Sequence, residues 1–244
     1  MVPDNRGVCG RYAATKDAAT IADFFHAEEL PLASPQMPRI PNYNVTPTSE
    51  VFVVLEQDDT RRVDVARWGL IPSWSKDASR ASRMINARSE TVADKPAYRS
   101  AFRKRRCLVP ADGYYEWQAR PEHPKQPFFI HDEQSGPLAF AGLYEDWDGP
   151  DGAVRSCTIC TMDAQGPLAR IHDRMTVVVP QGEWANWLNP GTQDPEELLE
   201  RLVNQAGAGA LVAYPVSTHV NKPANNGPQL LTPVAAEPSP PGQP

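Results

Sequence analysis

The chain lacks the long apolar segments and the phosphate-binding loops that define several common protein classes. No stretch approaches the roughly eighteen apolar residues of a membrane-spanning helix, and the N-terminal region has no apolar core typical of a secretory signal. The sequence contains no G-x-x-x-x-G-K-[ST], G-x-G-x-x-G, H-E-x-x-H or G-x-S-x-G motif. These absences argue against a membrane protein, a P-loop NTPase, a dinucleotide-dependent enzyme and a serine hydrolase.

Cysteine is scarce. Four cysteines in 244 residues do not form a disulfide framework, so we expect a reducing, cytoplasmic environment. Cys157 and Cys160 form a C-x-x-C pair, which is typical of zinc or redox sites. The surrounding residues predict a strand, however, where a spacing of three places the two side chains on opposite faces. With no second Cys/His pair at zinc spacing, we expect these residues and Cys107 to be buried, and no metal or cofactor to be bound.

Excess positive charge is also absent from the chain as a whole. The net charge of −6 argues against a purely electrostatic nucleic-acid binder. Between Arg80 and Cys107, however, nine Lys and Arg residues stand against two acidic residues. Such a basic stripe is a candidate site for a polyanion. Its RKRR end (103–106), taken alone, is more typical of a solvated helix end.

The composition is that of a globular protein, with 41% hydrophobic and 22% charged residues. Strands outnumber helices and often follow one another directly, which predicts one α+β domain with mainly antiparallel sheets. The last residues, AAEPSPPGQP, predict a Pro-rich disordered tail over 234–244. Apolar periodicity predicts helices over 16–29, from Asp94 through Phe102, and over 194–204, and strands at 51–56, 62–68, 106–111, 114–118, 127–131, 138–144, 154–162, 175–180 and 209–216.

Two residues outside the predicted core are candidate nucleophile and base. Cys9 lies in GVCGRY (7–12) beside Gly10, so its thiol is not obviously packed, and the Arg11 guanidinium would favour the thiolate. A lone cysteine is nonetheless more often a core residue than a nucleophile. His172 lies among charged residues in RIHDRM (170–175), where an acid such as Asp173 could hold one tautomer. The alternative is a loop histidine with satisfied hydrogen bonds.

Two further polar residues lie inside predicted extended segments. Glu116, in DGYYEW (112–117), has aromatic neighbours that should raise the pKa of its carboxyl, which suits a general acid or base. The alternative is a strand glutamate that faces water. In MINARSET (84–91), Asn86 and Arg88 could share one face of an extended segment and hold a polar ligand. That pair alone is weak evidence of a site.

Taken in order, these segments resemble the SRAP family (SOS-response-associated peptidase domain), whose members shield abasic sites in DNA. The resemblance extends from Cys9 to about Pro233, which predicts one SRAP domain over 9–233 with antiparallel sheets in a barrel- or sandwich-like core and flanking helices. The matching segments are CGRY (9–12), PNYNVTPT (41–48), RWGLIPSW (67–74), INARSET (85–91), RRCLVPADGYYEW (105–117), QPFFI (126–130), AFAGLYEDW (139–147), CTICTMDA (157–164) and RIHDRM (170–175).

The resemblance implies a covalent reaction with DNA. Family members crosslink to abasic sites in single-stranded DNA through an N-terminal cysteine, and that role falls on Cys9. The family's other active-site residues fall on Asn86, Glu116 and His172, and its DNA-binding residues on Arg11, Arg88, Trp74 and Arg174. The basic stripe would flank a groove that follows the phosphates. We expect a monomer in a bacterial cytoplasm, associated with the nucleoid when bound to DNA, with no metal, cofactor or membrane partner.

The chemistry requires a free α-amine on Cys9. The amine forms a Schiff base with the aldehyde of the opened sugar, and the thiol then closes a thiazolidine. Residues 1–8 would convert that amine to an amide, so we expect them to be removed or, if Val8 is encoded by a GTG start codon, never made. Two other functions stay open. One is a thiol autopeptidase or cysteine hydrolase using Cys9 and His172, and the other is a non-catalytic module that binds single-stranded DNA. The resemblance also admits lyase-type cleavage at abasic sites.

Overall fold

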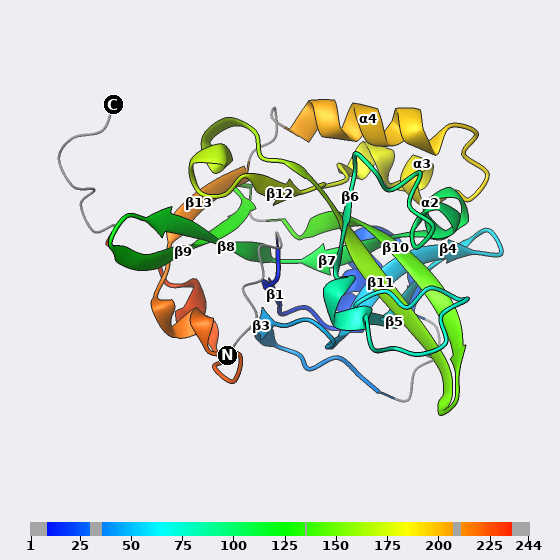
Figure 1. Ribbon diagram of the computed structural model, residues 1–244, viewed down its shortest axis with the longest axis horizontal. Helices are drawn as coiled ribbons and strands as arrows, with labels where there is room; N and C mark the ends of the chain where they lie inside the picture. The colour runs from blue at the N-terminus through cyan, green and yellow to red at the C-terminus, as the bar shows by residue number, and fades with distance from the viewer. Residues whose placement is uncertain (1–8, 30–35, 135, 207–210, 236–244) are drawn as a thin grey trace.

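Two β-sheets and a shell of short helices form the structure, a computed structural model (Figure 1). It describes residues 9–29, 36–134, 136–206 and 211–235, so the predicted extension (1–8) and most of the predicted tail (234–244) lie outside the described residues. One buried apolar cluster includes residues of both sheets. The mainly antiparallel α+β architecture predicted from the sequence is confirmed.

The larger of the two sheets, the eight-stranded sheet B, closes into a barrel. Strands β11, β10, β7, β4 and β5 pair as antiparallel neighbours, and parallel pairing of β5 with β11 completes the ring, with Ser156 opposite Arg67 and Cys157 opposite Trp68. Closure explains why β4 and β7 are continuous apolar runs, because both of their faces are covered. The strands of sheet B are β2 (Glu28–Glu29), β4 (Glu50–Gln57), β5 (Thr60–Trp68), β6 (Asn86–Arg88), β7 (Arg106–Ala111), β10 (Leu138–Gly149), β11 (Gly152–Asp163) and β12 (Arg174–Thr176).

The five-stranded sheet, sheet A, pairs β1, near the start of the described chain, with β8. Its order is β13–β9–β8–β1–β3, and the register of β1 on β8 sets Tyr12 opposite Tyr114. Figure 1 shows the C-terminal segment, in orange and red, against the β8–β9 end of this sheet. Val220 of this segment and Tyr115 of β8 belong to a second apolar cluster. The strands of sheet A are β1 (Tyr12–Ala14), β3 (Asn42–Val45), β8 (Gly113–Arg120), β9 (His123–Asp132) and β13 (Leu211–Pro215).

Two of the three predicted helices are shorter than the apolar periodicity predicts. The helix predicted over 16–29 ends at Phe25, because His26 adopts a left-handed conformation with φ of 52°, and Glu28–Glu29 then pairs with β5 as β2. The helix predicted from Asp94 begins at Arg99, after a series of turns. The helices are α1 (Ala18–Phe25), α2 (Arg99–Lys104), α3 (Trp184–Leu188) and α4 (Pro195–Gln205).

The predicted α4 boundary is confirmed, since the Asp194 carboxylate accepts a hydrogen bond of 2.9 Å from the Glu197 amide as an N-cap. The predicted strand at 209–216 is β13, and its first two positions lie outside the described residues. The sequence did not predict β1, β3 or α3, which are too short to show a period. Short 3₁₀ turns complete the fold: η1 (Ala81–Arg83), η2 (Gly166–Arg170), η3 (Gln181–Glu183), η5 (Thr218–Asn221) and η6 (Pro228–Leu231).

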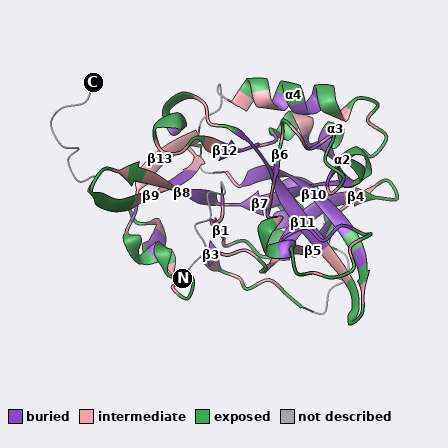
Figure 2. Cartoon of the chain, in the orientation of Figure 1, coloured by how far each residue is buried: buried purple, intermediate pink, exposed green. Residues whose placement is uncertain are grey.

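Burial follows the barrel. Figure 2 shows the buried residues concentrated on β7, β10 and β11, whereas α4 turns an exposed face to solvent. Cys107, Cys157 and Cys160 are buried free thiols, as the strand pattern predicts. Among the described residues, no helix is long and apolar enough to cross a membrane, and no group of three or more His, Cys, Asp or Glu side chains is arranged to hold a metal ion.

Candidate functional site

The site is centred on a contact between Cys9 and Glu116, which are 107 positions apart in the sequence. The backbone N–H of Cys9 donates a hydrogen bond of 2.6 Å to Oε1 of Glu116, and both residues are buried. Strand pairing creates this contact. Because Tyr12 of β1 lies opposite Tyr114 of β8, the residues that precede β1 run alongside Glu116.

Burial changes the ionisation of Glu116. The side chain belongs to a residue only 3% exposed, and desolvation raises the pKa of its carboxyl to about 8. The Cys9 N–H opposes this shift, nearby Asp173 adds to it, and Lys125 opposes it. The raised pKa expected from the aromatic neighbours is therefore confirmed, and the alternative of a water-facing strand glutamate is wrong.

The Cys9 thiol is buried, as the alternative of a core cysteine predicts, and not open as its neighbour Gly10 suggests. The residue is fully buried, and burial, followed by the charge of Glu116, raises the pKa of the thiol well above its usual range. The expected stabilisation by the Arg11 guanidinium is wrong. The contribution from Arg11 that lowers the pKa of the thiol comes from its backbone and not from its guanidinium. The sequence could not show this, because it depends on how residues 9–11 fold against β8.

The Arg11 side chain points to the C-terminal segment. Its Nη1 donates hydrogen bonds of 2.8 Å to Oδ1 of Asn44 and 2.7 Å to the carbonyl of Val220. The guanidinium also lies 5.8 Å from the centre of the Trp117 ring. These contacts make Arg11 a link between β1, β3 and η5. Its predicted role in binding DNA stays a prediction.

His172 lies in the loop between η2 and β12. Its Nδ1 is 3.1 Å from the backbone N–H of Arg174 and 2.8 Å from a carboxylate oxygen of Asp173. A neutral ring cannot accept one of these hydrogen bonds and donate the other from the same nitrogen. The Arg174 N–H is fixed in the backbone, whereas the Asp173 side chain is 86% exposed and can rotate away. We therefore assign Nδ1 as the acceptor, which leaves the proton on Nε2.

Two features keep this imidazole neutral and in place. Burial lowers the pKa of His172, Asp173 raises it, and Lys125 lowers it. Gln118 of β8 donates a hydrogen bond of 2.8 Å to the carbonyl of Arg170, which anchors the loop to the strand that carries Glu116. Glu116 and His172 thus share the charged neighbours Asp173 and Lys125. Lys125 is an exposed residue of β9 that the sequence analysis did not single out.

Asn86 and Arg88 occupy β6. This strand pairs with β11 in parallel, with Asn86 opposite Ile159 and Arg88 opposite Thr161. Asn86 is half-buried and Arg88 exposed, while Ala87 between them is buried, which agrees with the predicted shared face. Thr161 also pairs with Thr176 of β12. Strands β6 and β12 therefore lie on opposite sides of β11, with Thr161 between Arg88 and Thr176.

Arg174 is held by acidic side chains. Its guanidinium makes two hydrogen bonds to the Glu90 carboxylate, at 2.6 and 3.0 Å, and also contacts the Asp163 carboxylate. A further bond of 3.0 Å reaches the carbonyl of Thr161. These contacts tie the start of β12 to β11 and to the turn after β6.

Trp74 is an exposed aromatic residue. It is 67% exposed, in the loop between β5 and η1, and the exposed cations Lys76, Arg80 and Arg83 lie close to it in sequence. An exposed indole beside cations suits stacking on an unpaired base.

The basic stripe does not line one groove over its whole length. Arg106 is buried, and its guanidinium donates to the carbonyls of Phe102, Arg103, Trp187 and Asn189. Burial lowers its pKa to about 10. Arg105 likewise pairs with the buried carboxylate of Glu145 at 2.7 Å. The expectation that the stripe through Arg106 follows the phosphates is therefore wrong at its RKRR end.

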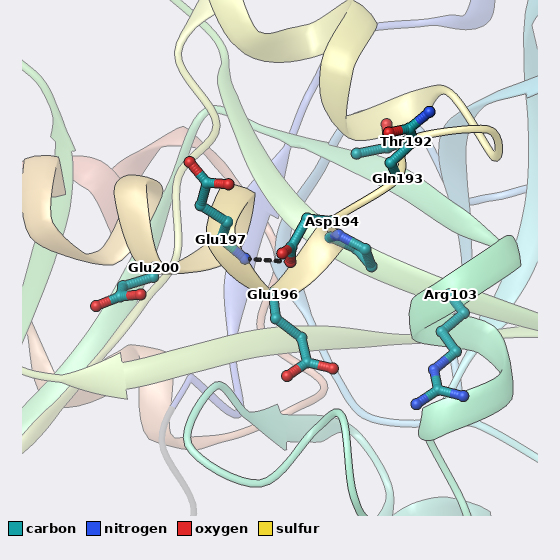
Figure 3. A pocket seen from close by; sticks show the side chains of 8 residues that line it. Arg103, Thr192, Gln193, Asp194, Glu196, Glu197 and Glu200 are labelled. Atoms are coloured by element: carbon teal, nitrogen blue, oxygen red, sulfur yellow. Dashed lines mark hydrogen bonds between the residues drawn. The ribbon is translucent and has the colours of Figure 1, made fainter.

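A surface pocket beside α4 lies apart from these residues. Figure 3 shows Arg103 on one side and the carboxylates of Glu196, Glu197 and Glu200 on the other, with the Asp194 cap between them. Its acidic lining is unsuited to a phosphate backbone. The contact between Cys9 and Glu116 is a better candidate for chemistry, because a buried carboxyl with a raised pKa there meets the backbone nitrogen of a cysteine.

The chain belongs to the family described as SOS response associated peptidase (SRAP), whose model matches residues 8–223. This confirms the resemblance seen in the motifs. Among its relatives is the abasic site processing protein YoqW of Bacillus subtilis, which is 37% identical over 225 residues covering 92% of this chain and 99% of that protein. The abasic site processing protein HMCES of Xenopus tropicalis is 34% identical over 226 residues, covering 78% of this chain and 65% of that protein.

Solved structures share the fold. A protein from Bacteroides thetaiotaomicron has a TM-score of 0.79 at 25% identity, covering 93% of this chain and all of that chain. A phage-related protein from Bordetella bronchiseptica has a TM-score of 0.65 at 29% identity, covering 86% and 95%. The arrangement of sheets described above is therefore that of a known architecture.

Proposed function

We propose that this protein processes abasic sites in single-stranded DNA by forming a covalent crosslink through Cys9 as its N-terminal residue. The observation that carries the proposal is the 2.6 Å contact between the Cys9 nitrogen and a buried carboxyl whose pKa is raised to about 8. Relatives named abasic site processing proteins, which match 92% of this chain, support the choice of substrate.

The reaction balances without a cofactor. Ring opening moves the anomeric hydroxyl proton away and delivers a proton to the ring oxygen, which frees an aldehyde at C1. The neutral α-amine of Cys9 adds to C1, and loss of the carbinolamine hydroxyl as water gives the Schiff base. The sulfur then adds to C1 while the nitrogen accepts a proton. The product is a thiazolidine, and one water is released.

Glu116 is the proposed general acid and base. A carboxyl with a pKa of about 8 remains largely protonated at neutral pH, so it can deliver a proton to the ring oxygen or to the departing hydroxyl. An α-amine titrates near ~7.7–8.0, so the two groups can exchange one proton across their short contact. His172, with Nε2 protonated, supplies a second donor. Asn86 would orient the sugar or the amine, and Arg88 and Trp74 would hold the strand.

The test compares two chains that differ only at the N-terminus. One begins at Cys9, and the other retains residues 1–8, with both N-termini verified by intact mass. Each is incubated with single-stranded DNA carrying an abasic site and, as a control, a tetrahydrofuran analogue that has no aldehyde. We expect a heat-stable adduct only from the first chain and only on the abasic strand, and we expect Cys9→Ala to abolish it. Equal adduct from the chain that retains residues 1–8 would refute the mechanism.

The same assay distinguishes crosslinking from the other functions that the sequence leaves open. A thiol hydrolase needs a thiolate activated by a base, and here burial raises the thiol pKa while Nδ1 of His172 accepts a backbone N–H. A non-catalytic binding module would retain abasic and intact strands equally and leave no adduct after denaturation. Strand cleavage beside the adduct would reveal an additional lyase activity.

A further inference from the structure

Glu90, in the turn that follows β6, is a charged residue to which the proposed reaction assigns no role. Its two carboxylate oxygens accept hydrogen bonds from Nη1 and Nη2 of Arg174, at 2.6 and 3.0 Å. A carboxylate that receives a guanidinium with both of its oxygens fixes the direction of the arginine as well as pairing its charge. Glu90 follows Arg88 by two positions, so it belongs to the segment that also carries Asn86.

The guanidinium of Arg174 lies where water does not readily replace a lost partner. Its side chain is 11% exposed, and Nη2 also donates a hydrogen bond of 3.0 Å to the carbonyl of Thr161. The same carbonyl accepts a bond of 2.8 Å from the N–H of Ser89, the residue before Glu90. Asp163 contacts the guanidinium as well, but its side chain is 84% exposed. Loss of the Glu90 carboxylate would therefore cost more than loss of an exposed ion pair.

The ion pair joins two strands that each pair with β11 rather than with each other. On one side of β11, Arg88 of β6 lies opposite Thr161, and on the other side Arg174 of β12 lies opposite Asp163. Strand β12 has only three residues, so few backbone hydrogen bonds hold it to the sheet. Glu90 supplies a further attachment at the first residue of that strand.

Two groups compete for Nδ1 of His172. The backbone N–H of Arg174 is 3.1 Å away and needs an acceptor, whereas a carboxylate oxygen of Asp173 is 2.8 Å away and needs a donor. While Arg174 stays in place, Nδ1 accepts and the neutral ring carries its proton on Nε2. If Arg174 moves away, Nδ1 can carry the proton and donate it to Asp173, and Nε2 then has no hydrogen. The position of Arg174 therefore selects the tautomer.

We propose that Glu90 is a positioning residue for His172, acting through Arg174: its carboxylate holds Arg174 so that the imidazole proton stays on Nε2. The inference rests on the proposed function, in which Nε2 is a proton donor. A ring that carries its proton on Nδ1 cannot donate from Nε2, although the nucleophile and the DNA strand are unaffected. Glu90 therefore acts on the rate of the chemistry and not on the binding of DNA.

The tautomer is measured without DNA. Two-bond ¹H–¹⁵N correlation spectra of the 244-residue chain, recorded where the imidazole is neutral, distinguish protonated from unprotonated ring nitrogens, and the His172 signals are those lost in His172→Gln. Glu90→Gln keeps the side-chain length but turns an amide NH₂ toward the guanidinium. It should shift the His172 signals toward the form protonated on Nδ1.

Asp163→Asn is the matched control. It removes the same charge from the same guanidinium, but the side chain is exposed and leaves both hydrogen bonds from Arg174 to Glu90 in place. It should leave the His172 signals unchanged. If Glu90→Gln does not fold, Glu90→Asp, which shortens the side chain by one methylene and withdraws it from the guanidinium, should give the same shift of tautomer.

A double-mutant cycle in the chain that begins at Cys9 tests the consequence for the reaction. Glu90→Gln should slow crosslinking to abasic single-stranded DNA by about tenfold, and Asp163→Asn by less than about twofold. Because Glu90 acts only through His172, adding Glu90→Gln to His172→Gln should change the rate by less than about twofold. Affinity for intact single-stranded DNA should not fall, since the substitution removes a negative charge beside Arg174.

Unchanged His172 signals in Glu90→Gln would overturn the inference. A tenfold loss of rate that persists in the His172→Gln background, or an equal loss in Asp163→Asn, would do the same. A loss of rate matched by a loss of strand affinity would assign Glu90 to DNA binding and also overturn it. If no chain forms an adduct, the proposed function fails, and the spectra still test the link from Glu90 to His172.

Discussion

Replacing Glu116 by Gln tests whether a buried carboxyl is kept protonated near neutral pH. In the unfolded chain the carboxyl titrates near 4.5, whereas burial raises its pKa to about 8 in the native protein. Between these values the unfolded chain has released the proton and the native protein retains it. Raising the pH over this range therefore destabilises the native state, by about 1.4 kcal/mol per pH unit. The full separation corresponds to a cost on the order of 5 kcal/mol above pH 8.

Gln removes this titration and keeps an oxygen that can accept the Cys9 N–H. Urea unfolding should therefore show the two proteins close in stability at pH 5 and Glu116→Gln more stable by at least about 2 kcal/mol at pH 9. The measurement uses the 244-residue chain, in which the Cys9 nitrogen is an amide and adds no charge of its own. In the chain that begins at Cys9, Glu116→Gln should slow crosslinking roughly a hundredfold. Parallel pH profiles of stability would show that the native carboxyl ionises normally, and would refute the reasoning.

Three further substitutions test the remaining roles. His172→Gln should slow crosslinking by roughly tenfold to a thousandfold and leave affinity for intact single-stranded DNA unchanged, as measured by gel assay and fluorescence anisotropy; an unaltered rate would exclude His172 as a proton donor. Arg88→Glu should weaken binding to any single strand and reduce the slope of log affinity against log salt by about one contact, so an unchanged slope would mean that Arg88 does not meet phosphate. Trp74→Ala should cost about 1–3 kcal/mol of strand affinity with no change in melting temperature, because the indole is 67% exposed; a fall in melting temperature with full affinity would place it in the fold instead.

Local sequence predicted those parts of the site that depend on local chemistry. The raised pKa predicted for Glu116 is confirmed, but its cause is burial of the carboxyl and not the rings on either side, which point to the opposite face of the strand. The strand periodicity also predicted three buried cysteines correctly. By contrast, Gly10 suggested an open thiol at Cys9, whereas the structure buries it, in agreement with the alternative of a core cysteine, and the Glu116 partner of its backbone nitrogen is 107 positions away.

Charge patterns were the least reliable signal, because a charged side chain can be satisfied by distant carbonyls. Arg106 belongs to a run of four cations that suggests solvent, yet its guanidinium caps the carbonyl ends of α2 and α3. Arg11 suggested a partner for the thiolate and instead meets Asn44 and Val220, 33 and 209 positions away. The helix predicted over 16–29 failed for a different reason, since apolar spacing does not show the left-handed residue at which the chain turns.

The YYEW segment lies on β8, and hydrogen bonds from this one strand reach the separate parts of the candidate site. The Tyr115 N–H donates to the Arg11 carbonyl, and the Glu116 carboxylate accepts from the Cys9 nitrogen. Trp117 donates to Asn221 in the C-terminal segment, and Gln118 anchors the His172 loop. Successive side chains of a strand point to opposite faces, so one strand can hold partners on both sides of the sheet. A slip of one residue in β8 would exchange the two faces and remove the carboxyl from the Cys9 nitrogen. The register of β8 on β1 is therefore what places Glu116 beside Cys9.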